Sequence, residues 1–258
     1  MIQVNAQADG CAHQTGILIK SRAPAAMTFP DLFERFSMTI LPLGTSDATH
    51  LRFQAVARYA SARAGDAPFT GNGSDQIAFV ASGSTKLVAH ASGGREQVVA
   101  FHFAGDLVSV PARAAHAYTL CALEDCELIY FPAEEFYKLA RFEAGMVDEV
   151  LERVMKALAR CREKTITLGR KNAQERLANF LLTMDERIGA DNDGGRLLDL
   201  PMSRRDVADS LGLTIETVSR QFGELRDAGL LETMGRSKVM LLDLQGLAAR
   251  AGHLFEPA

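Results

Sequence analysis

The chain has 258 residues, of which 47% are hydrophobic, and its formal net charge at pH 7 is −4. That length and apolar content allow a hydrophobic core in each of two domains, because a domain usually spans about 100 to 200 residues. No run of about 18 apolar residues and no basic, apolar leader occurs, so we expect a cytoplasmic protein without a membrane span or a secretion signal. Acidic and basic side chains nearly balance from residue 170 onward, so any contact with nucleic acid requires positive groups clustered on one face.

Residues 1–30 show no clear hydrophobic periodicity, and we expect an irregular N-terminal extension there. Residues 31–142 are predicted to form a β-rich domain, because short β-prone runs alternate with glycines between Ala60 and Pro132. That spacing is typical of a small antiparallel barrel or jelly roll. The clearest runs are residues 77–81, 86–90 and 97–103.

Scattered histidines and cysteines raise the alternative of a haem or metal site, but no two of them have a recognised metal-ligand spacing. A cupin-like enzyme would require a His-x-His pair followed by Glu to hold its metal. The sequence also has no phosphate-binding loop, nucleophile elbow or zinc-protease motif, so we expect no enzyme. A small-molecule- or metal-binding β-barrel protein without specific DNA binding stays open as the alternative. The residues concerned are Cys11, His13, His90, His102 and His116.

Residues 143–169 are predicted to form one long helix with an apolar stripe. Positions along it follow spacings of 4, 3, 4, 3, 4 and 3 residues, which is the pattern of a two-helix coiled coil and predicts a dimer. Packing of the stripe against the chain's own β-domain explains the periodicity equally well. Gly169 is the expected hinge before a helix over residues 172–188. The stripe consists of Val147, Leu151, Val154, Leu158, Cys161, Thr165 and Leu168.

Residues 170–258 are predicted to form a winged helix-turn-helix domain. Ser203 is expected to cap a short helix that ends at Leu211, and Gly212 allows a sharp turn after it. The helix over residues 172–188 would turn its apolar side chains toward the core of this domain. Those side chains are Leu177, Phe180, Leu181 and Met184.

A second short helix and a β-hairpin complete the predicted domain. Thr214 is suited to cap this helix, and Gly229 is suited to end it in the left-handed conformation. Residues 230–233 and 238–242 are predicted as two strands around a tight turn, which together make a wing.

The second helix separates an apolar face from a polar one at the 3.6-residue period. On the polar face, the Arg220 guanidinium fits guanine O6 and N7, the Glu216 carboxylate accepts from cytosine N4, and the Ser219 hydroxyl serves either role. A polar helix face is more often merely solvated, but the paired helix, the turn and the wing favour base recognition here. The apolar face comprises Ile215, Val218, Phe222 and Leu225, and the polar face comprises Glu216, Ser219, Arg220 and Gly223.

The run ETVSR at residues 216–220 resembles the E-x-x-S-R motif of the CRP/FNR superfamily of bacterial transcription regulators, on its FNR/FixK side. The resemblance covers about residues 60–252 and implies a cyclic-nucleotide-binding-like β-roll, a dimerisation helix and a winged helix-turn-helix. It implies a homodimeric activator that works with RNA polymerase and reads a palindrome resembling TTGAT-N4-ATCAA through Glu216, Ser219 and Arg220. The positions comparable to the family's phosphate contacts are Ser203, Arg204, Thr214, Thr217, Arg236 and Lys238.

The resemblance also bears on the effector. Oxygen-sensing FNR proteins hold an iron-sulfur cluster with closely spaced N-terminal cysteines and a central one, because the cluster needs four thiolates. Only Cys11 lies near this N-terminus, so the FixK-type branch without the cluster is the closer match. CRP proteins bind cAMP with a carboxylate and with an Arg followed by Ser or Thr, whereas here Asp106 supplies an acid but Arg113 precedes Ala114. We therefore expect no iron-sulfur cluster, cAMP or other cofactor, and haem stays open.

The remaining cysteines are Cys121 and Cys126 in the β-domain and Cys161 on the long helix. In a cytosolic protein we expect them to be reduced and to pack as small apolar residues. Cys161 has a second interpretation, because a coiled-coil seam would place its thiol beside that of the partner. A redox role for Cys161 is therefore the competing hypothesis.

Overall fold

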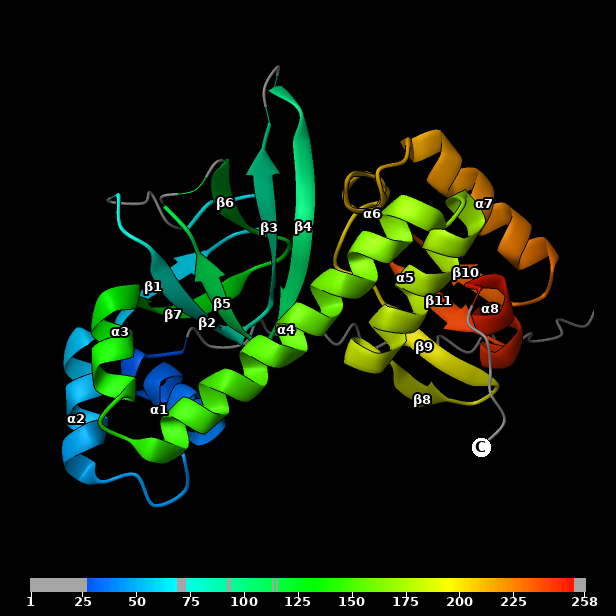
Figure 1. Ribbon diagram of the computed structural model, residues 1–258. Helices are drawn as coiled ribbons and strands as arrows, with labels where there is room; N and C mark the ends of the chain where they lie inside the picture. Colours follow the sequence, from blue (N-terminus) through cyan, green and yellow to red (C-terminus); the bar gives the residue numbers. More distant parts are fainter. Residues whose placement is uncertain (1–26, 69–72, 92–93, 113, 115, 253–258) are drawn as a thin grey trace, which may run out of the picture.

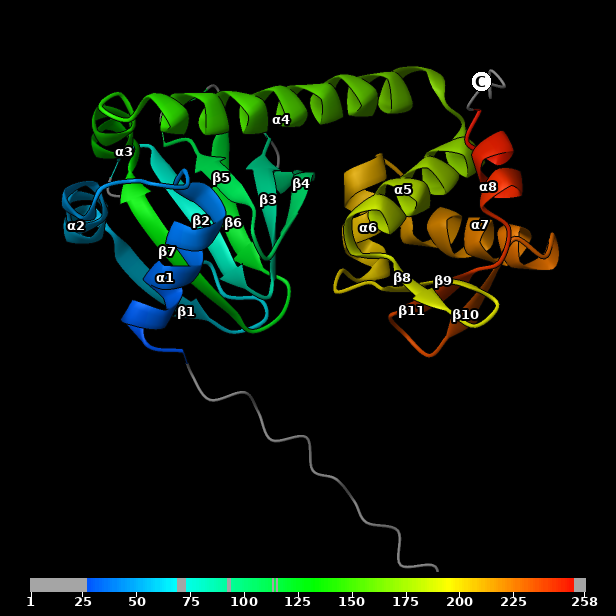
Figure 2. The same cartoon turned by 90° about the horizontal axis from the view of Figure 1, so that it is seen from below.

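The computed structural model describes residues 27–68, 73–91, 94–112, 114 and 116–252, so Cys11, His13, Arg113 and nearly all of the expected N-terminal extension lie outside the described residues. Two domains are joined by one long helix, α4 (Ala144–Arg170), which runs along the β-rich domain and reaches the C-terminal domain (Figures 1 and 2). Within the described ranges, no helix combines the length and apolar character that crossing a lipid bilayer requires.

The N-terminal domain is a β-roll of two antiparallel sheets, so the expected fold class is confirmed. The runs predicted at residues 77–81, 86–90 and 97–103 are its strands β2, β3 and β4. The strands are β1 (Arg58–Ala62), β2 (Gln76–Ser82), β3 (Ser84–His90), β4 (Glu96–Phe103), β5 (Leu107–Val110), β6 (Ala117–Ala122) and β7 (Cys126–Pro132). Their orders are β1-β7-β2-β5 and β4-β3-β6. Gly83 links β2 to β3 at φ +75°, and a Cβ there would lie 2.5 Å from the Asp125 carbonyl oxygen, so only glycine fits.

Three helices pack beside the sheet that contains β2 and β7. They are α1 (Phe29–Ile40), α2 (Asp47–Val56) and α3 (Ala133–Ala140). Buried phenylalanines hold them there, with the rings of Phe36 and Phe131 4.9 Å apart between centroids. We did not predict α1 and α2 from the sequence. A signal was present for α1, because Thr28 and Asp31 form a capping box at its start.

Helix α4 does not end at Gly169, so the bend between α4 and α5 lies two residues after the predicted position. Helix α4 continues through Gly169 to Arg170, because a single glycine costs an otherwise favourable helix only about 1 kcal/mol. The chain turns at Lys171, whose backbone is extended (φ −85°, ψ 143°). Asn172 then caps α5 (Ala173–Ile188) by accepting hydrogen bonds from the backbone amides of the first turn.

Over residues 171–252, the C-terminal domain contains four helices and a four-stranded sheet of order β10-β11-β9-β8. The predicted hairpin is present as β10 and β11, and β11 also pairs with β9, so the wing is part of this sheet. Leu177, Phe180, Leu181 and Met184 of α5 are all buried, as predicted. The other elements are β8 (Ala190–Asn192), β9 (Gly195–Asp199), α6 (Arg204–Leu211), α7 (Ile215–Asp227), β10 (Leu231–Met234), β11 (Lys238–Leu241) and α8 (Leu244–Arg250).

One apolar cluster extends across both domains. Val88, Val98 and Phe101 point outward from the sheet β4-β3-β6 and belong to the same buried cluster as the core of the C-terminal domain. The ring of Phe101 meets that of Phe180 edge-on, with centroids 6.0 Å apart. The C-terminal domain is therefore docked on the β-roll, with α6 next to β4 (Figure 1).

Candidate nucleic-acid interface

Hydrogen bonds at the helix starts fix the positions of α6 and α7. The Ser203 hydroxyl accepts from the Asp206 amide at 3.2 Å, and the Asp206 carboxylate accepts from the Ser203 amide at 2.8 Å. Thr214 caps α7 by accepting from the Thr217 amide at 3.2 Å. Since these side chains satisfy amides that lack a partner in the helix, both predicted caps are confirmed.

Glycines in the left-handed conformation end both helices. Gly212 has φ +63° and turns the chain between α6 and α7. Gly229 has φ +71° just after α7, where its amide donates to the Arg226 carbonyl. The predicted turn and helix end are therefore present, and both rest on a backbone conformation that favours glycine.

The two faces of α7 differ in exposure as the sequence pattern predicts. Val218, Phe222 and Leu225 are buried and Ile215 is half-buried, whereas Glu216, Ser219 and Arg220 are exposed. The Arg220 side chain is 67% exposed and lies 3.7 Å from the Glu224 carboxylate one turn along the helix. Hydrogen bonds from its own backbone amide and from Thr214 lower the pKa of Glu216. The helix therefore presents a charged guanidinium and a carboxylate to solvent side by side.

The candidate phosphate-contacting residues fall into two groups. Ser203, Thr214, Arg236 and Lys238 are exposed, the first two at helix starts and the last two at the β10–β11 hairpin, and Thr217 in the first turn of α7 is half-buried. Arg204 is different, because its guanidinium lies over the Phe222 ring at 3.2 Å from the centroid. Burial there lowers the pKa of Arg204 to about 10. Arg204 therefore contributes to the packing of α6 against α7.

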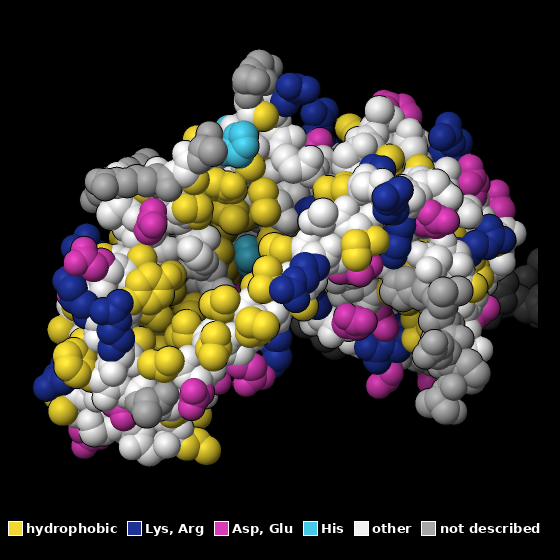
Figure 3. Space-filling view, in the orientation of Figure 1, with side chains coloured by type: hydrophobic (Ala, Val, Ile, Leu, Met, Phe, Trp, Pro, Cys, Tyr) yellow, Lys and Arg dark blue, Asp and Glu magenta, His cyan; other side chains and the backbone are white. Residues whose placement is uncertain are grey.

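The predicted α4 stripe points away from the core of its own protomer. Exposed fractions are 45% for Val147, 56% for Leu151, 54% for Val154 and 40% for Leu158. Figure 3 shows hydrophobic side chains gathered along this helix and the adjacent β-roll. Packing on the chain's own β-domain, the alternative explanation of the stripe, therefore does not account for these four residues. Cys161 and Thr165 are exposed as well, and Leu168 is half-buried.

The opposite face of α4 contacts the β-roll through polar groups. Arg153 donates to the carbonyls of Gly105 and Thr39, at 3.1 and 3.0 Å. Farther along, the Lys164 ammonium donates to the carbonyls of Val98 and Val99, both at 2.8 Å. Burial lowers the pKa of Lys164 to about 8. These contacts hold α4 over the β4–β5 turn and along β4.

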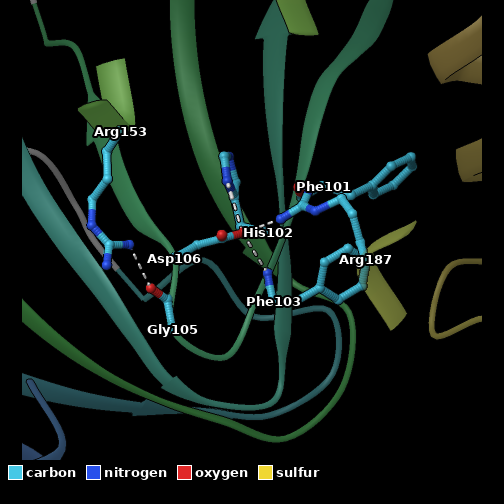
Figure 4. A network of polar contacts seen from close by, with 7 residues as sticks. All are labelled: Phe101, His102, Phe103, Gly105, Asp106, Arg153 and Arg187. Carbon is cyan, nitrogen blue, oxygen red and sulfur yellow. Dashed lines mark hydrogen bonds and ion pairs between the residues drawn. The ribbon is translucent and has the colours of Figure 1, made fainter. Parts of the chain in front are cut away.

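Asp106, the acid expected in the sensor pocket, lies in a network that reaches the other domain (Figure 4). Its carboxylate accepts from the Phe103 amide at 2.9 Å and forms an ion pair with Arg187 of α5. It also lines a cleft of about 290 Å³ between the β-roll, α3 and α4. Because Arg187 already neutralises this carboxylate, the arrangement does not fit a free acid waiting for the ribose of a cyclic nucleotide.

The histidines and cysteines are spread over separate places. Among the residues that the structure describes, no three His, Cys, Asp or Glu side chains come together as a metal site. His90 contacts the Thr119 hydroxyl at 2.8 Å, and His102 lies beside Asp106 with 15% of its side chain exposed. Cys121, Cys126 and Cys161 are free thiols. Burial raises the pKa of Cys121 and raises that of Cys126 to about 11, so both resist ionisation.

The sequence did not reveal the polar contacts between the domains. Besides Asp106 and Arg187, Lys86 of β3 pairs with Asp206 of α6, and Lys164 of α4 donates to the Ser210 hydroxyl at 3.1 Å. These partners lie 46 to 120 residues apart, so no local spacing could have marked them.

Comparison with known proteins agrees with this geometry. Residues 175–250 match the Crp-like helix-turn-helix domain family, and residues 61–141 match the cyclic nucleotide-binding domain family. The chain is 31% identical to the transcriptional activator protein FnrL of Cereibacter sphaeroides over 204 residues, which are 77% of this chain and 82% of that protein. It is 36% identical to the nitrogen fixation regulation protein FixK of Rhizobium meliloti over 161 residues, covering 62% of this chain and 71% of the relative.

Solved structures show the same architecture. FixK2 from Bradyrhizobium japonicum superposes with a TM-score of 0.67 at 29% identity, over 78% of this chain and all of that chain. A mutant of CooA from Carboxydothermus hydrogenoformans shares the fold. It superposes with a TM-score of 0.68 at 22% identity, over 81% of this chain and 92% of that chain. The exposed polar face on a capped helix, the β-roll and these relatives lead to one conclusion: the chain belongs to the CRP/FNR family and is a DNA-binding transcription regulator of the FixK type.

Proposed function

We propose that the chain works as a homodimer that binds a palindromic DNA site resembling TTGAT-N4-ATCAA and regulates transcription from it. The observation that carries this proposal is the exposed set Glu216, Ser219 and Arg220 on the outer face of α7. The second helix of a helix-turn-helix enters the major groove, where such side chains meet base edges.

Each of the three side chains has a fitting partner in the proposed half-site. The Arg220 guanidinium would donate to O6 and N7 of the guanine, and the Glu216 carboxylate would accept from N4 of a cytosine. The Ser219 hydroxyl would serve a neighbouring donor or acceptor. Releasing Arg220 from Glu224 costs little, because the pair is exposed and 3.7 Å long.

Phosphate contacts would orient the domain on the duplex without reading its sequence. Ser203, Thr214 and Thr217 lie at the starts of α6 and α7, where backbone amides favour an anion. Arg236 and Lys238 would reach the backbone from the hairpin. The guanidinium of Arg204 lies over the Phe222 ring, so Arg204 would contact a phosphate only through the nitrogen atoms that point away from that ring.

The α4 stripe supports the dimer. Two recognition helices must lie about 34 Å apart to enter successive major grooves of a palindrome. A coiled coil of two α4 helices would cover the exposed Val147, Leu151, Val154 and Leu158, and would continue through Cys161, Thr165 and Leu168.

One of the relatives suggests how DNA binding acts on transcription. FnrL is named a transcriptional activator, so we propose that this chain likewise activates transcription by contacting RNA polymerase. Such a regulator would act in the cytoplasm, where bacterial promoters lie.

A gel-shift titration with a TTGAT-N4-ATCAA duplex tests the proposal, with a scrambled duplex of equal length and composition as the control. We expect a complex of two chains per duplex and much weaker binding to the scrambled sequence. Equal affinity for both duplexes would refute sequence-specific recognition. The absorption spectrum of the purified protein, recorded beforehand, shows directly whether haem is bound.

A further inference from the structure

Arg187 ties the far end of α5 to the β4–β5 turn of the β-roll. One guanidinium nitrogen donates to the Phe101 carbonyl at 2.8 Å, and another pairs with the Asp106 carboxylate. The guanidinium also lies 4.6 Å from the centroid of the Phe103 ring. Figure 4 shows this side chain reaching the turn beside His102. Only 17% of the Arg187 side chain and 26% of the Asp106 side chain are exposed, so the pair is largely shielded from water.

Arg187 lies at the end of α5 that is far from the bend between α4 and α5, so this contact opposes rotation of the domain about that bend. The domain is connected to α4 through Lys171 and the cap residue Asn172, and Arg187 lies in the last turn of the 16-residue helix α5 that follows. At 1.5 Å per residue the contact lies about 20 Å from the hinge. At the hinge end, Arg176 donates to the carbonyls of Lys171 and Leu168, at 2.9 and 2.8 Å. Rotation about the hinge is therefore restrained at both ends of α5.

Contacts along α6 add further points of attachment. Lys86 of β3 pairs with Asp206 at the start of α6. At the other end, Gln97 of β4 donates to the Ser210 carbonyl at 3.2 Å, and Lys164 of α4 donates to the Ser210 hydroxyl. The domain therefore contacts the rest of the chain through Arg187 on α5 and through Asp206 and Ser210 at the two ends of α6. Contacts at three separated positions fix the orientation of a rigid domain.

This docking leaves the DNA-reading face free. Helix α6 faces β4, whereas Glu216, Ser219 and Arg220 on α7 are exposed while the domain is docked. A docked domain can therefore meet the major groove without first leaving the β-roll.

We propose that the Arg187–Asp106 pair is a latch that holds the DNA-binding domain on the β-roll in its DNA-binding orientation. The inference rests on the proposed palindrome-binding dimer. Two half-sites fix both the distance and the angle between the recognition helices, so a domain that rotates freely at Lys171 loses conformational freedom on binding. The latch restricts this freedom before DNA arrives.

The test compares Arg187→Ala, Asp106→Asn and the double variant with the parent, in gel-shift titrations without any added small molecule. Asn keeps an oxygen that can accept from the Phe103 amide, so the turn retains that bond. Each single variant should lose about 10-fold in affinity for the palindrome, a typical size for coupling between sites. The double variant should lose hardly more than Arg187→Ala, because that change alone already removes the ion pair with Asp106 as well as the contacts with Phe101 and Phe103. Arg250→Ala, which removes an exposed arginine of α8 that donates to the Gln174 side chain within the same domain, should bind like the parent.

Two further measurements separate a latch from a general loss of structure. Arg187→Ala should discriminate less than the parent between the N4 palindrome and palindromes with one or two base pairs added to the spacer. Amide hydrogen exchange should increase in β4 and α6 of this variant and stay unchanged in α8.

If Arg187→Ala binds the palindrome with the affinity and the spacer preference of the parent, the latch is overturned. Tighter binding of the palindrome by this variant would also overturn it, because the docked orientation would then inhibit DNA binding. If all variants, the parent included, fail to bind the palindrome, the proposed function itself fails.

Discussion

Lys86 of β3 and Asp206 of α6 form an ion pair with 2.5 Å between Nζ and Oδ1, although 120 residues separate them. The other carboxylate oxygen of Asp206 accepts from the amide and the hydroxyl of Ser203, at 2.8 and 2.6 Å. One side chain thus caps the first helix of the helix-turn-helix and joins it to the β-roll. Burial alone would raise the pKa of Asp206, but hydrogen bonds from Lys86 and Ser203 outweigh it and lower the pKa.

Replacing Asp206 should therefore cost more stability than replacing its capping partner. Ser203→Ala removes the hydroxyl that accepts from the Asp206 amide and donates to the Asp206 carboxylate, and should lower the free energy of unfolding by about 1 kcal/mol. Asp206→Ala also leaves Lys86 without its partner and should cost roughly twice as much. Urea titration followed by circular dichroism measures both values. Equal losses would mean that Lys86 contributes nothing to the stability of α6.

Arg220→Ala should weaken DNA binding by about 1 to 3 kcal/mol per half-site and relax the preference for the contacted guanine. The reason is the loss of two hydrogen bonds to one base edge. Gel-shift titrations on the palindrome and on a duplex with that guanine replaced measure the effect, with Arg250→Ala as the control for loss of charge. Equal weakening on specific and scrambled DNA would assign Arg220 to the phosphates.

Replacing Leu151 and Leu158 by Asp should yield monomers that bind the palindrome poorly. In the proposed dimer both side chains would be buried, and burying unpaired carboxylates is costly. Sedimentation velocity measures the oligomeric state. Ala159→Asp is the matched control, because Ala159 is exposed and lies about 100° around the helix from Leu158. A double variant that sediments as a dimer would remove the stripe from the interface.

The stability of the protein should fall between pH 6.5 and about 4 because of His102. Burial, only partly offset by the nearby Asp106 carboxylate, lowers the pKa of this imidazole from 6.5 to about 4. In that window the unfolded chain binds the proton and the folded chain does not, so lowering the pH favours unfolding, by up to about 3 kcal/mol. His102→Gln should show a shallower decline in denaturant titrations at several pH values. Parallel curves for parent and variant would show that His102 is not the group responsible.

Cys161 should respond to peroxide if it lies on the dimer seam. Two thiols and one peroxide molecule would give a disulfide and two water molecules, and the bridge would alter helix packing three turns before the bend at Lys171. DNA affinity should then fall on oxidation and return with a thiol reductant, as gel shifts measure. Cys161→Ser should be insensitive. A variant as sensitive as the parent would assign the response to another cysteine.

Local features of the C-terminal domain could be predicted from the sequence alone. Thr214 and Ser203 cap helices, Gly212 and Gly229 adopt positive φ, and Val218 and Phe222 are buried while Arg220 is exposed. Each of these depends on residues within a few positions of one another, so periodicity and capping chemistry contain the necessary information.

The contacts between residues that lie far apart in the sequence were decided only by the tertiary structure. No sequence pattern singles out Arg187, and the sequence offers Asp106 only as a possible acid of the sensor pocket. The docking of α5 on the β4–β5 turn makes them an ion pair. Arg204 likewise became a packing residue once α6 placed it over Phe222. Such contacts depend on how whole domains pack, and short-range patterns of hydrophobicity and capping contain no information about that.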